Sequence, residues 1–358
     1  MFRAAAAALA LAFASGPCLA DPIADFYAGK RITVLISAPA GSGYDTYARL
    51  LARHIVRHIP GNPSYVAQNM PAAGGMVLLN SVYNTGARDG TVIFTLHFNL
   101  PLYQALGGCG VRYDAAKLIG LGRLLASDTA IGVSSSAKSG VKTIADAKKT
   151  EVTIGSTGAT SNATLYPLIM NNMVGTKFKI VEGYEGENAV FLAMERGEID
   201  GFGSYSYLTF KSVRPDYLTK HLFYPLVQFG AEREQAWPDV PTAIDLAGDE
   251  TDRRAMALAS SGPDIGFSYF MPPGVPPERV SALRKAFTDM LADPAFREEA
   301  AHAKLDLRLA DAATVEGIVH NVLTAPRPVI DRLRVLMSGP GVDEANAKAC
   351  ARVQEGKN

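Results

Sequence analysis

The chain has 358 residues, and its 35 basic and 35 acidic side chains cancel to a formal net charge of zero. A balanced charge gives no global field that would attract nucleic acid or an anionic membrane surface, so neither partner is expected. The length exceeds what one hydrophobic core usually serves and favours two domains.

The first twenty residues have the pattern of a secretory signal peptide. Arg3 precedes a run of Ala, Leu and Phe that is too short to stay in a bilayer, and small residues stand before the expected cut after Ala20. We therefore expect a mature protein that starts near Asp21 and works in the periplasm.

Removal of that segment leaves two cysteines, Cys109 and Cys350. In an oxidising compartment a disulfide between them is expected, with two unpaired thiols as the alternative. Such a bridge would tie the C-terminal tail to the first lobe.

The first mature element of interest is Ile32–Arg53. An apolar strand pattern at Ile32–Ile36 enters the small-residue turn Ser37–Gly43, and a helical pattern of apolar residues follows. Bare backbone amides and the partial positive charge of a helix N-terminus favour a carboxylate or phosphate at such a turn. The alternative is an ordinary strand-to-helix connection.

The chain continues through alternating strand and helix patterns as far as the strand Thr91–Leu96. This alternation predicts a largely parallel sheet, in which ligands bind beyond the carboxyl ends of the strands. The ends of interest are Pro39–Tyr44 and His97–Asn99. His97 either packs in the wall of the site or lines the cleft.

The opening pattern recurs further along. The strand Val152–Ile154 leads into Gly155–Ser161 and another helical pattern, so two such units, one in each lobe, would face each other across a cleft. We place a crossover near residue 120. The expected domains are a first lobe of residues 21–120 and 228–358 and a second lobe of residues 121–227.

Signatures of catalysis and metal binding are scarce. The sequence has no G-x-S-x-G elbow and no phosphate-binding P-loop, and no cofactor is expected. His54 and His58 fit a solvated helix face rather than a metal site. Asp45 suits the first turn of a helix, where it complements the helix dipole, whereas Asp200 is either a turn residue or an acceptor that faces the cleft.

Short motifs, in this order, resemble those of the receptor proteins of tripartite tricarboxylate transporters, the Bug-type periplasmic solute-binding proteins. The motifs are PAGSGYD at Pro39–Asp45, NMPAAGG at Asn69–Gly75, ARDG at Ala87–Gly90, GSTG at Gly155–Gly158, YEG at Tyr184–Gly186, GEID at Gly197–Asp200 and PDVPT at Pro238–Thr242. The segment Asp249–Phe267 does not match the family pattern.

The resemblance implies a type II-like, two-lobed α/β binding protein that closes like a Venus flytrap on a small organic carboxylate, a di- or tricarboxylate or an aromatic acid. It also implies no enzymatic activity and delivery of the ligand, by a monomer, to membrane permease subunits. Carried over by motif, the candidate ligand-binding residues are Ala40, Gly41, Ser42, Gly155, Ser156, Thr157 and Ala159, with Tyr44, Thr160, Ser161, Tyr184, Asp200 and Tyr205 for the remainder of the ligand. For the serines and threonines the alternative is local capping of turns and helices.

Two other functions stay open at this point. A sensor protein that presents its ligand to a signalling kinase would have the same sequence features. A secreted hydrolase would use Asp200 or a loop serine, but the nucleophile, base and orienting group that it needs are not evident.

Overall fold

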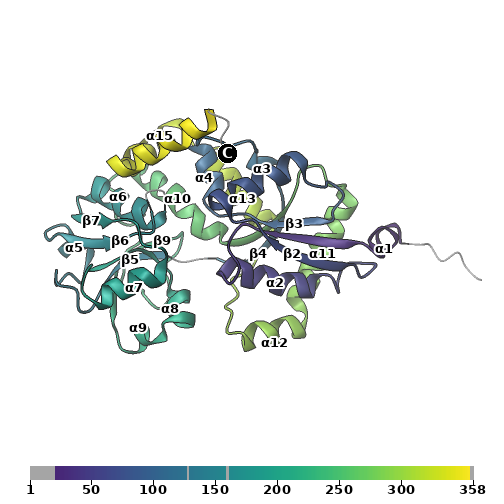
Figure 1. Ribbon diagram of the computed structural model, residues 1–358, viewed down its shortest axis with the longest axis horizontal. Coiled ribbons are helices and arrows are strands. Elements are labelled where there is room, and N and C mark those ends of the chain that lie inside the picture. Colours follow the sequence, from purple (N-terminus) through teal and green to yellow (C-terminus); the bar gives the residue numbers. More distant parts are fainter. Residues whose placement is uncertain (1–20, 127–128, 159–160, 355–358) are drawn as a thin grey trace, which may run out of the picture.

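The computed structural model describes residues 21–126, 129–158 and 161–354 and arranges them as two lobes, each built on its own sheet (Figure 1). This arrangement confirms the two-lobed α/β fold expected from the sequence. Among the described residues, no helix combines the length and the apolar character needed to cross a membrane.

The first sheet has the strand order β11-β4-β10-β3-β1-β2. Its strands are β1 (Arg31–Ile36), β2 (Ser64–Asn69), β3 (Val92–Thr95), β4 (Ile119–Leu125), β10 (Phe267–Met271) and β11 (Ala310–Asp311). β1 pairs in parallel with β2 and β3, and β10 pairs antiparallel with both β3 and β4. β1 to β4 therefore run in one direction, and β10 is a reversed strand inserted among them.

The second sheet has the order β7-β6-β8-β5-β9. Its strands are β5 (Thr129–Ser134), β6 (Val152–Gly155), β7 (Phe178–Val181), β8 (Gly201–Tyr205) and β9 (Phe223–Phe229). β6 is parallel to β7 and β8, whereas β5 is antiparallel to β8 and β9. Both sheets are thus mixed, because β5 and β10 each follow a passage from the other lobe.

Helices connect and cover these strands. They are α1 (Pro22–Tyr27), α2 (Gly43–Ile55), η1 (Ala72–Gly75), α3 (Met76–Thr85), α4 (Leu100–Ala105), η2 (Ala115–Lys117), α5 (Ile144–Ala147), α6 (Asn162–Val174), α7 (Glu187–Glu195), α8 (Tyr207–Val213), α9 (Pro215–Thr219), α10 (Glu250–Ile265), α11 (Pro277–Ala292), α12 (Pro294–His302), α13 (Ala312–Leu323), α14 (Arg327–Met337) and α15 (Pro340–Gln354).

The strand and helix at the start of the mature chain form as their apolar spacing predicts. Ile32, Val34 and Ile36 alternate into the core along β1, and α2 buries Leu51 and Ile55 on the face that packs against the first sheet. Fully burying side chains of this size contributes about 1.5–3 kcal/mol each. The packing fixes both the end of β1 and the start of α2, and so the loop between them.

Sheet membership favours a boundary between the lobes after Leu125, because all of β4 pairs in the first sheet. Residues 250–265, which resembled no family motif, form α10. Met256 of α10 and Leu333 of α14 belong to the hydrophobic cluster that also holds Val152 of β6, so these two helices pack with the second lobe.

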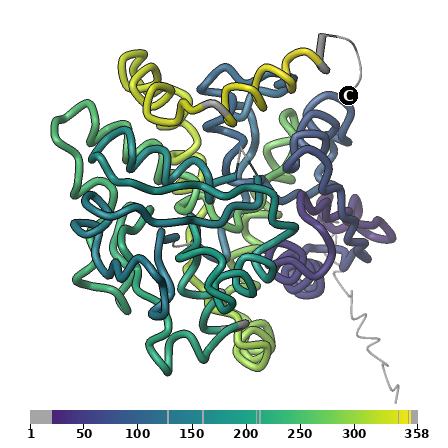
Figure 2. The backbone as a smooth tube through the Cα atoms, turned by 60° about the vertical axis from the view of Figure 1, so that its left-hand side comes forward, coloured from purple at the N-terminus to yellow at the C-terminus, as the bar shows by residue number. Residues whose placement is uncertain are grey.

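The C-terminal helix α15 lies along one edge of the molecule, from above α6 of the second lobe towards α4 of the first (Figure 1; Figure 2). A disulfide joins Cys350 of α15 to Cys109, which follows α4, across 241 residues of sequence. At the other end of α15, Gly339 and Gly341 lie against Leu168 and Glu182 of the second lobe. The helix is therefore a connection between the lobes that is covalent at one end.

Candidate functional site

The loop after β1 is held in place from within. Gly41 has the left-handed φ of 79°, and its amide donates a hydrogen bond of 2.9 Å to Oδ2 of Asp45. The Ser42 hydroxyl donates to the carbonyl oxygen of Pro39 and accepts from the amide of Asp45, so Ser42 caps α2. Ala40 and Gly41 are exposed at this helix start.

Asp45 has a structural role in this loop. Its carboxylate also accepts from Nε of Arg49 and from Nδ2 of Asn69, at 2.8 and 2.9 Å. Burial by itself would raise the pKa of Asp45, but the hydrogen bonds from Gly41, Asn69 and Arg49 outweigh it and lower the pKa. The side chain joins the glycine loop to the end of β2.

A second glycine-rich segment packs beneath the first loop. Gly75, at the end of η1, has a φ of 84°, and a Cβ placed there would lie 2.9 Å from Cβ of Ser37 and 3.1 Å from Cβ of His97. Only glycine combines that backbone conformation with that close approach. Gly75 therefore lets the segment NMPAAGG pack against the residues that follow both β1 and β3.

The side chains of Tyr44 and His97 pack together beside the loop after β1. The hydroxyl of Tyr44 accepts from the amide of Phe98 at 3.2 Å, and its ring stacks on that of His97 with centroids 5.6 Å apart. Burial lowers the pKa of His97 to about 4, so the ring is neutral at pH 7. Its Nδ1 is buried and has no hydrogen-bond partner in the described part of the chain.

The loop after β6 in the second lobe is closed by its own hydroxyl groups. Ser156 is fully buried, and its Oγ lies 2.9 Å from Oγ of Ser161 and 2.7 Å from Oγ1 of Thr164. Thr157 is exposed, and Gly155 is buried where a Cβ would meet Ile199 and Val190. The hydroxyls of Ser156 and Ser161 thus serve the loop itself. The candidates Ala159 and Thr160 lie outside the described residues.

The remaining candidates divide between the loop and the core. The amide of Tyr184 donates to the carbonyl oxygen of Ser156 at 3.3 Å, which places Tyr184 beside the second loop. Asp200 precedes β8, at the amino end of the strand, where its carboxylate accepts from the amide and hydroxyl of Thr153 and from the amide of Ser139. The ring of Tyr205 packs in the aromatic core of the second lobe.

His54 of α2 and His58, just after α2, contact carboxylates of α12 and of its N-cap residue Asp293. His54 is 1% exposed, not solvated as expected, because its Nε2 lies 2.7 Å from Oε2 of Glu299. His58 likewise contacts Asp293 at 3.1 Å. No group of metal-ligating side chains occurs among the residues that the structure describes.

A polar chain connects the starts of α2 and α6. Tyr44 in the first turn of α2 holds the amide of Phe98, and Nδ2 of the next residue, Asn99, donates to Oδ1 of Asn162 at 3.1 Å. Asn162 is the first residue of α6. Neither Asn99 nor Asn162 is among the candidates that the motifs predict, although Asn99 stands at a predicted strand end and Asn162 follows the second glycine loop.

The arrangement suits an anion and does not resemble a reactive centre. Two helices begin beside one lobe junction, and the first amides of a helix have no intrahelical acceptor. Their partial positive charge stabilises a negative group without any cationic side chain. The fold and this site define a two-lobed solute-binding protein.

The family of the chain follows from a comparison with known proteins. Residues 48–335 match the model of the tripartite tricarboxylate transporter family receptor, and the chain belongs to that family. Members of this family are solute-binding receptors and not enzymes, as the resemblance implied. No curated protein matches the chain.

Solved structures support the same fold. A TctC solute-binding protein from Polaromonas, without ligand, is 21% identical, with a TM-score of 0.63 over 86% of this chain and all of the other. The periplasmic binding protein BugD is 17% identical, with a TM-score of 0.60 over 87% of this chain and 99% of its own. MatC from Rhodopseudomonas palustris, with bound malate, is 18% identical, with a TM-score of 0.57 over 84% of this chain and 99% of its own.

Proposed function

We propose that this protein captures a small organic carboxylate in the periplasm and delivers it to the permease subunits of a tripartite tricarboxylate-type transporter. The observation that carries the proposal is the junction at Asn99 and Asn162, where the starts of α2 and α6 are linked from opposite lobes. Closure of the two lobes would place a carboxylate between both helix N-termini. Family membership and the malate bound to MatC support this choice of ligand class.

The ligand would be recognised mainly by backbone groups. The backbone amide of Gly41 already donates to Asp45. The donors proposed for the ligand are therefore the backbone amides of Gly43 and Tyr44 at the start of α2 and of Asn162 at the start of α6. Exposed Ala40 and Thr157, the unpartnered Nδ1 of His97, and Tyr184 would complete the site. The receptor would act as a monomer, and no cofactor enters this binding.

Calorimetry with a panel of di-, tri- and aromatic carboxylates tests the proposal on the mature protein. A bound acid should raise the free energy of unfolding by about 2.7 kcal/mol when its concentration is a hundredfold above Kd. The methyl ester of the same acid with every carboxyl group esterified, which lacks the charge, should not bind. If no carboxylate in the panel shifts the melting temperature at millimolar concentration, the proposal fails.

A pair of glycine variants locates the site. Gly41 and Gly29 both have left-handed φ and open space where a Cβ would stand, but only Gly41 precedes α2. Gly41→Leu should abolish carboxylate binding by covering the helix start, and Gly29→Leu should lose similar stability and keep its affinity. Equal affinities in the two variants would show that this loop does not form the site.

A further inference from the structure

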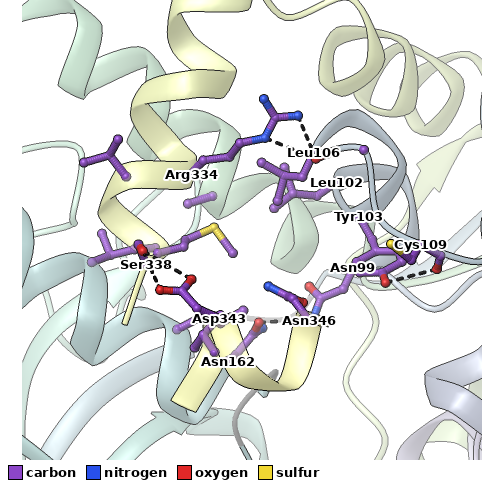
Figure 3. Close-up of a pocket in the computed structure, with 18 of the residues that line it drawn as sticks. Asn99, Leu102, Tyr103, Leu106, Cys109, Asn162, Arg334, Ser338, Asp343 and Asn346 are labelled. Atoms are coloured by element: carbon purple, nitrogen blue, oxygen red, sulfur yellow. Dashed lines mark hydrogen bonds between the residues drawn. The ribbon is translucent and has the colours of Figure 1, made fainter. Parts of the chain in front are cut away.

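A cavity of about 570 Å³ lies beneath α15 (Figure 3). Asn99 and Asn162 line it, but none of the described residues 39–44 and 155–158 does. It is therefore distinct from the glycine loops. Its walls come from α4 and the loop after it, from α6, α10 and α14, and from α15.

The cavity is held together by contacts that join the lobes. Nη2 and Nε of Arg334 on α14 both donate to the carbonyl oxygen of Leu106, at 2.7 and 3.2 Å. Nδ2 of Asn172 on α6 donates to the carbonyl oxygen of Ser338, just before α15. With the disulfide at Cys350, these contacts fix the cover of the cavity to both lobes. The cover lies beyond residue 335, where the family match ends.

The lining is mostly apolar, and its one cation among the described residues, Arg334, is already paired with a carboxylate. Leucine, isoleucine, valine and methionine side chains form most of the surface: Leu102, Leu106, Leu165, Ile169, Val335, Met337 and Val342. Nη1 of Arg334 binds Asp331 at 2.7 Å, and the carboxylate of Asp343 accepts from the Ser338 hydroxyl at 2.9 Å. The cavity therefore offers no unpaired cation for a carboxylate.

The polar groups of Asn162, Asp343 and Asn346 are gathered at one end of the cavity. In Figure 3 the amides of Asn162 and Asn346 lie across the cavity from Arg334 and Leu106. An apolar pocket with a few convergent polar groups, of several hundred Å³, has the usual character of a small-molecule site. The Asn162 amide is already bonded to Asn99 and Tyr166, so the Asn346 amide is the group that provides a hydrogen bond to a carbonyl, hydroxyl or N–H group of the ligand. It requires no charge on the ligand.

We propose that the cavity under α15 is a second ligand site, which takes a neutral and largely apolar small molecule with one hydrogen-bonding group. The cavity shares Asn162 with the proposed carboxylate site, but the rest of its lining is its own and its chemistry is apolar. Because its walls belong to both lobes, an occupant contacts the two lobes at once.

The test uses the full mature protein and N-phenyl-1-naphthylamine, a neutral aromatic fluorophore with one N–H group. The proposal expects saturable binding of one probe per chain. Val335 lines the cavity and is 60% exposed, so Val335→Trp should narrow the site without disturbing the core. The expected result is at least a tenfold weaker affinity, about 1.4 kcal/mol. Leu106→Trp, just after α4, also changes a lining residue and should act in the same direction.

Two controls make the outcome decisive. Leu192→Trp changes an exposed leucine of α7 that does not line the cavity and should leave the affinity for the probe unchanged. Gly41→Leu should also leave it unchanged, which separates this site from the carboxylate site. Absence of saturable binding, equal loss in Leu192→Trp, or loss in Gly41→Leu would each overturn the proposal, whatever the carboxylate titrations show.

Discussion

The side-chain amide of Asn99 donates a 3.1 Å hydrogen bond to the side-chain oxygen of Asn162, and so joins the end of β3 in one lobe to the first residue of α6 in the other. Asn162 in turn donates to the hydroxyl of Tyr166, whose ring stacks on Phe229 with centroids 3.7 Å apart. The contact thus continues into the core of the second lobe. The Asn99–Asn162 bond lies between the proposed carboxylate site and the cavity under α15.

Asn99→Ala should loosen the junction between the lobes. Loss of one hydrogen bond should cost about 0.5–1.5 kcal/mol in the free energy of unfolding. It should also increase the radius of gyration of the ligand-free protein in small-angle scattering. Asn84→Ala is the matched control, because the Asn84 amide binds only carbonyl oxygens within the first lobe. An unchanged radius in Asn99→Ala would show that this bond does not restrain the lobes.

Asp45→Asn should destabilise the first glycine loop. The carboxylate receives three hydrogen bonds, including one from Arg49, and a bond to a charged group contributes about 1.5–3 kcal/mol. Because the pKa of Asp45 is lowered in the folded state, its contribution is present above the unfolded pKa of about 3.9 and is lost as the pH falls through the folded value.

Urea denaturation at several pH values measures this effect. The difference in free energy of unfolding between wild type and Asp45→Asn should be constant above about pH 5 and shrink below about pH 4. Asp239→Asn, at an exposed position, provides the control. A difference that does not change with pH would show that the charge of Asp45 has no part in holding the loop.

Gly75→Ala should cost more stability than Gly74→Ala. Both glycines have left-handed φ, for which alanine pays about 1–2 kcal/mol. A Cβ at Gly74 meets nothing within 4 Å, whereas a Cβ at Gly75 would meet Ser37 and His97. The difference between the two variants in thermal denaturation therefore isolates the close approach of the loops. Equal losses would mean that Ser37 and His97 move aside without cost.

The sequence predicts the fold of this molecule better than it predicts the residues of the site. Apolar spacing is a local property, and it locates β1 and α2 because both bury one face. Reversal of β5 and β10 within the sheets depends on where the chain returns between lobes, which no local pattern records.

The roles of individual side chains are likewise harder to predict from the sequence than the positions of the loops. Motif order identifies both loops. The sequence does not distinguish a loop serine that binds a ligand from one that binds a neighbouring hydroxyl, as Ser156 does with Thr164. Asp200 stands in a family motif, yet its position at the amino end of β8 is visible only once the strands are paired. Asn99 and Asn162 meet through the packing of the lobes, across 63 residues, and neither residue alone has a distinctive pattern.

His97 should make the stability of the protein depend on pH between about 4 and 6.5. Burial lowers its pKa from 6.5 to about 4, so the unfolded chain binds a proton in this range and the folded chain does not. The contribution of His97 is therefore complete above pH 6.5 and is lost as the pH falls to 4, with about 1.4 kcal/mol for each pKa unit.

In His97→Gln the slope of unfolding free energy against pH should flatten in this window. His302→Gln, at an exposed site, should keep the wild-type slope. Because His97 is neutral at pH 7, carboxylate affinity in wild type should change little from pH 7 to 8, and a marked loss over that interval would indicate that a charged imidazole holds the ligand.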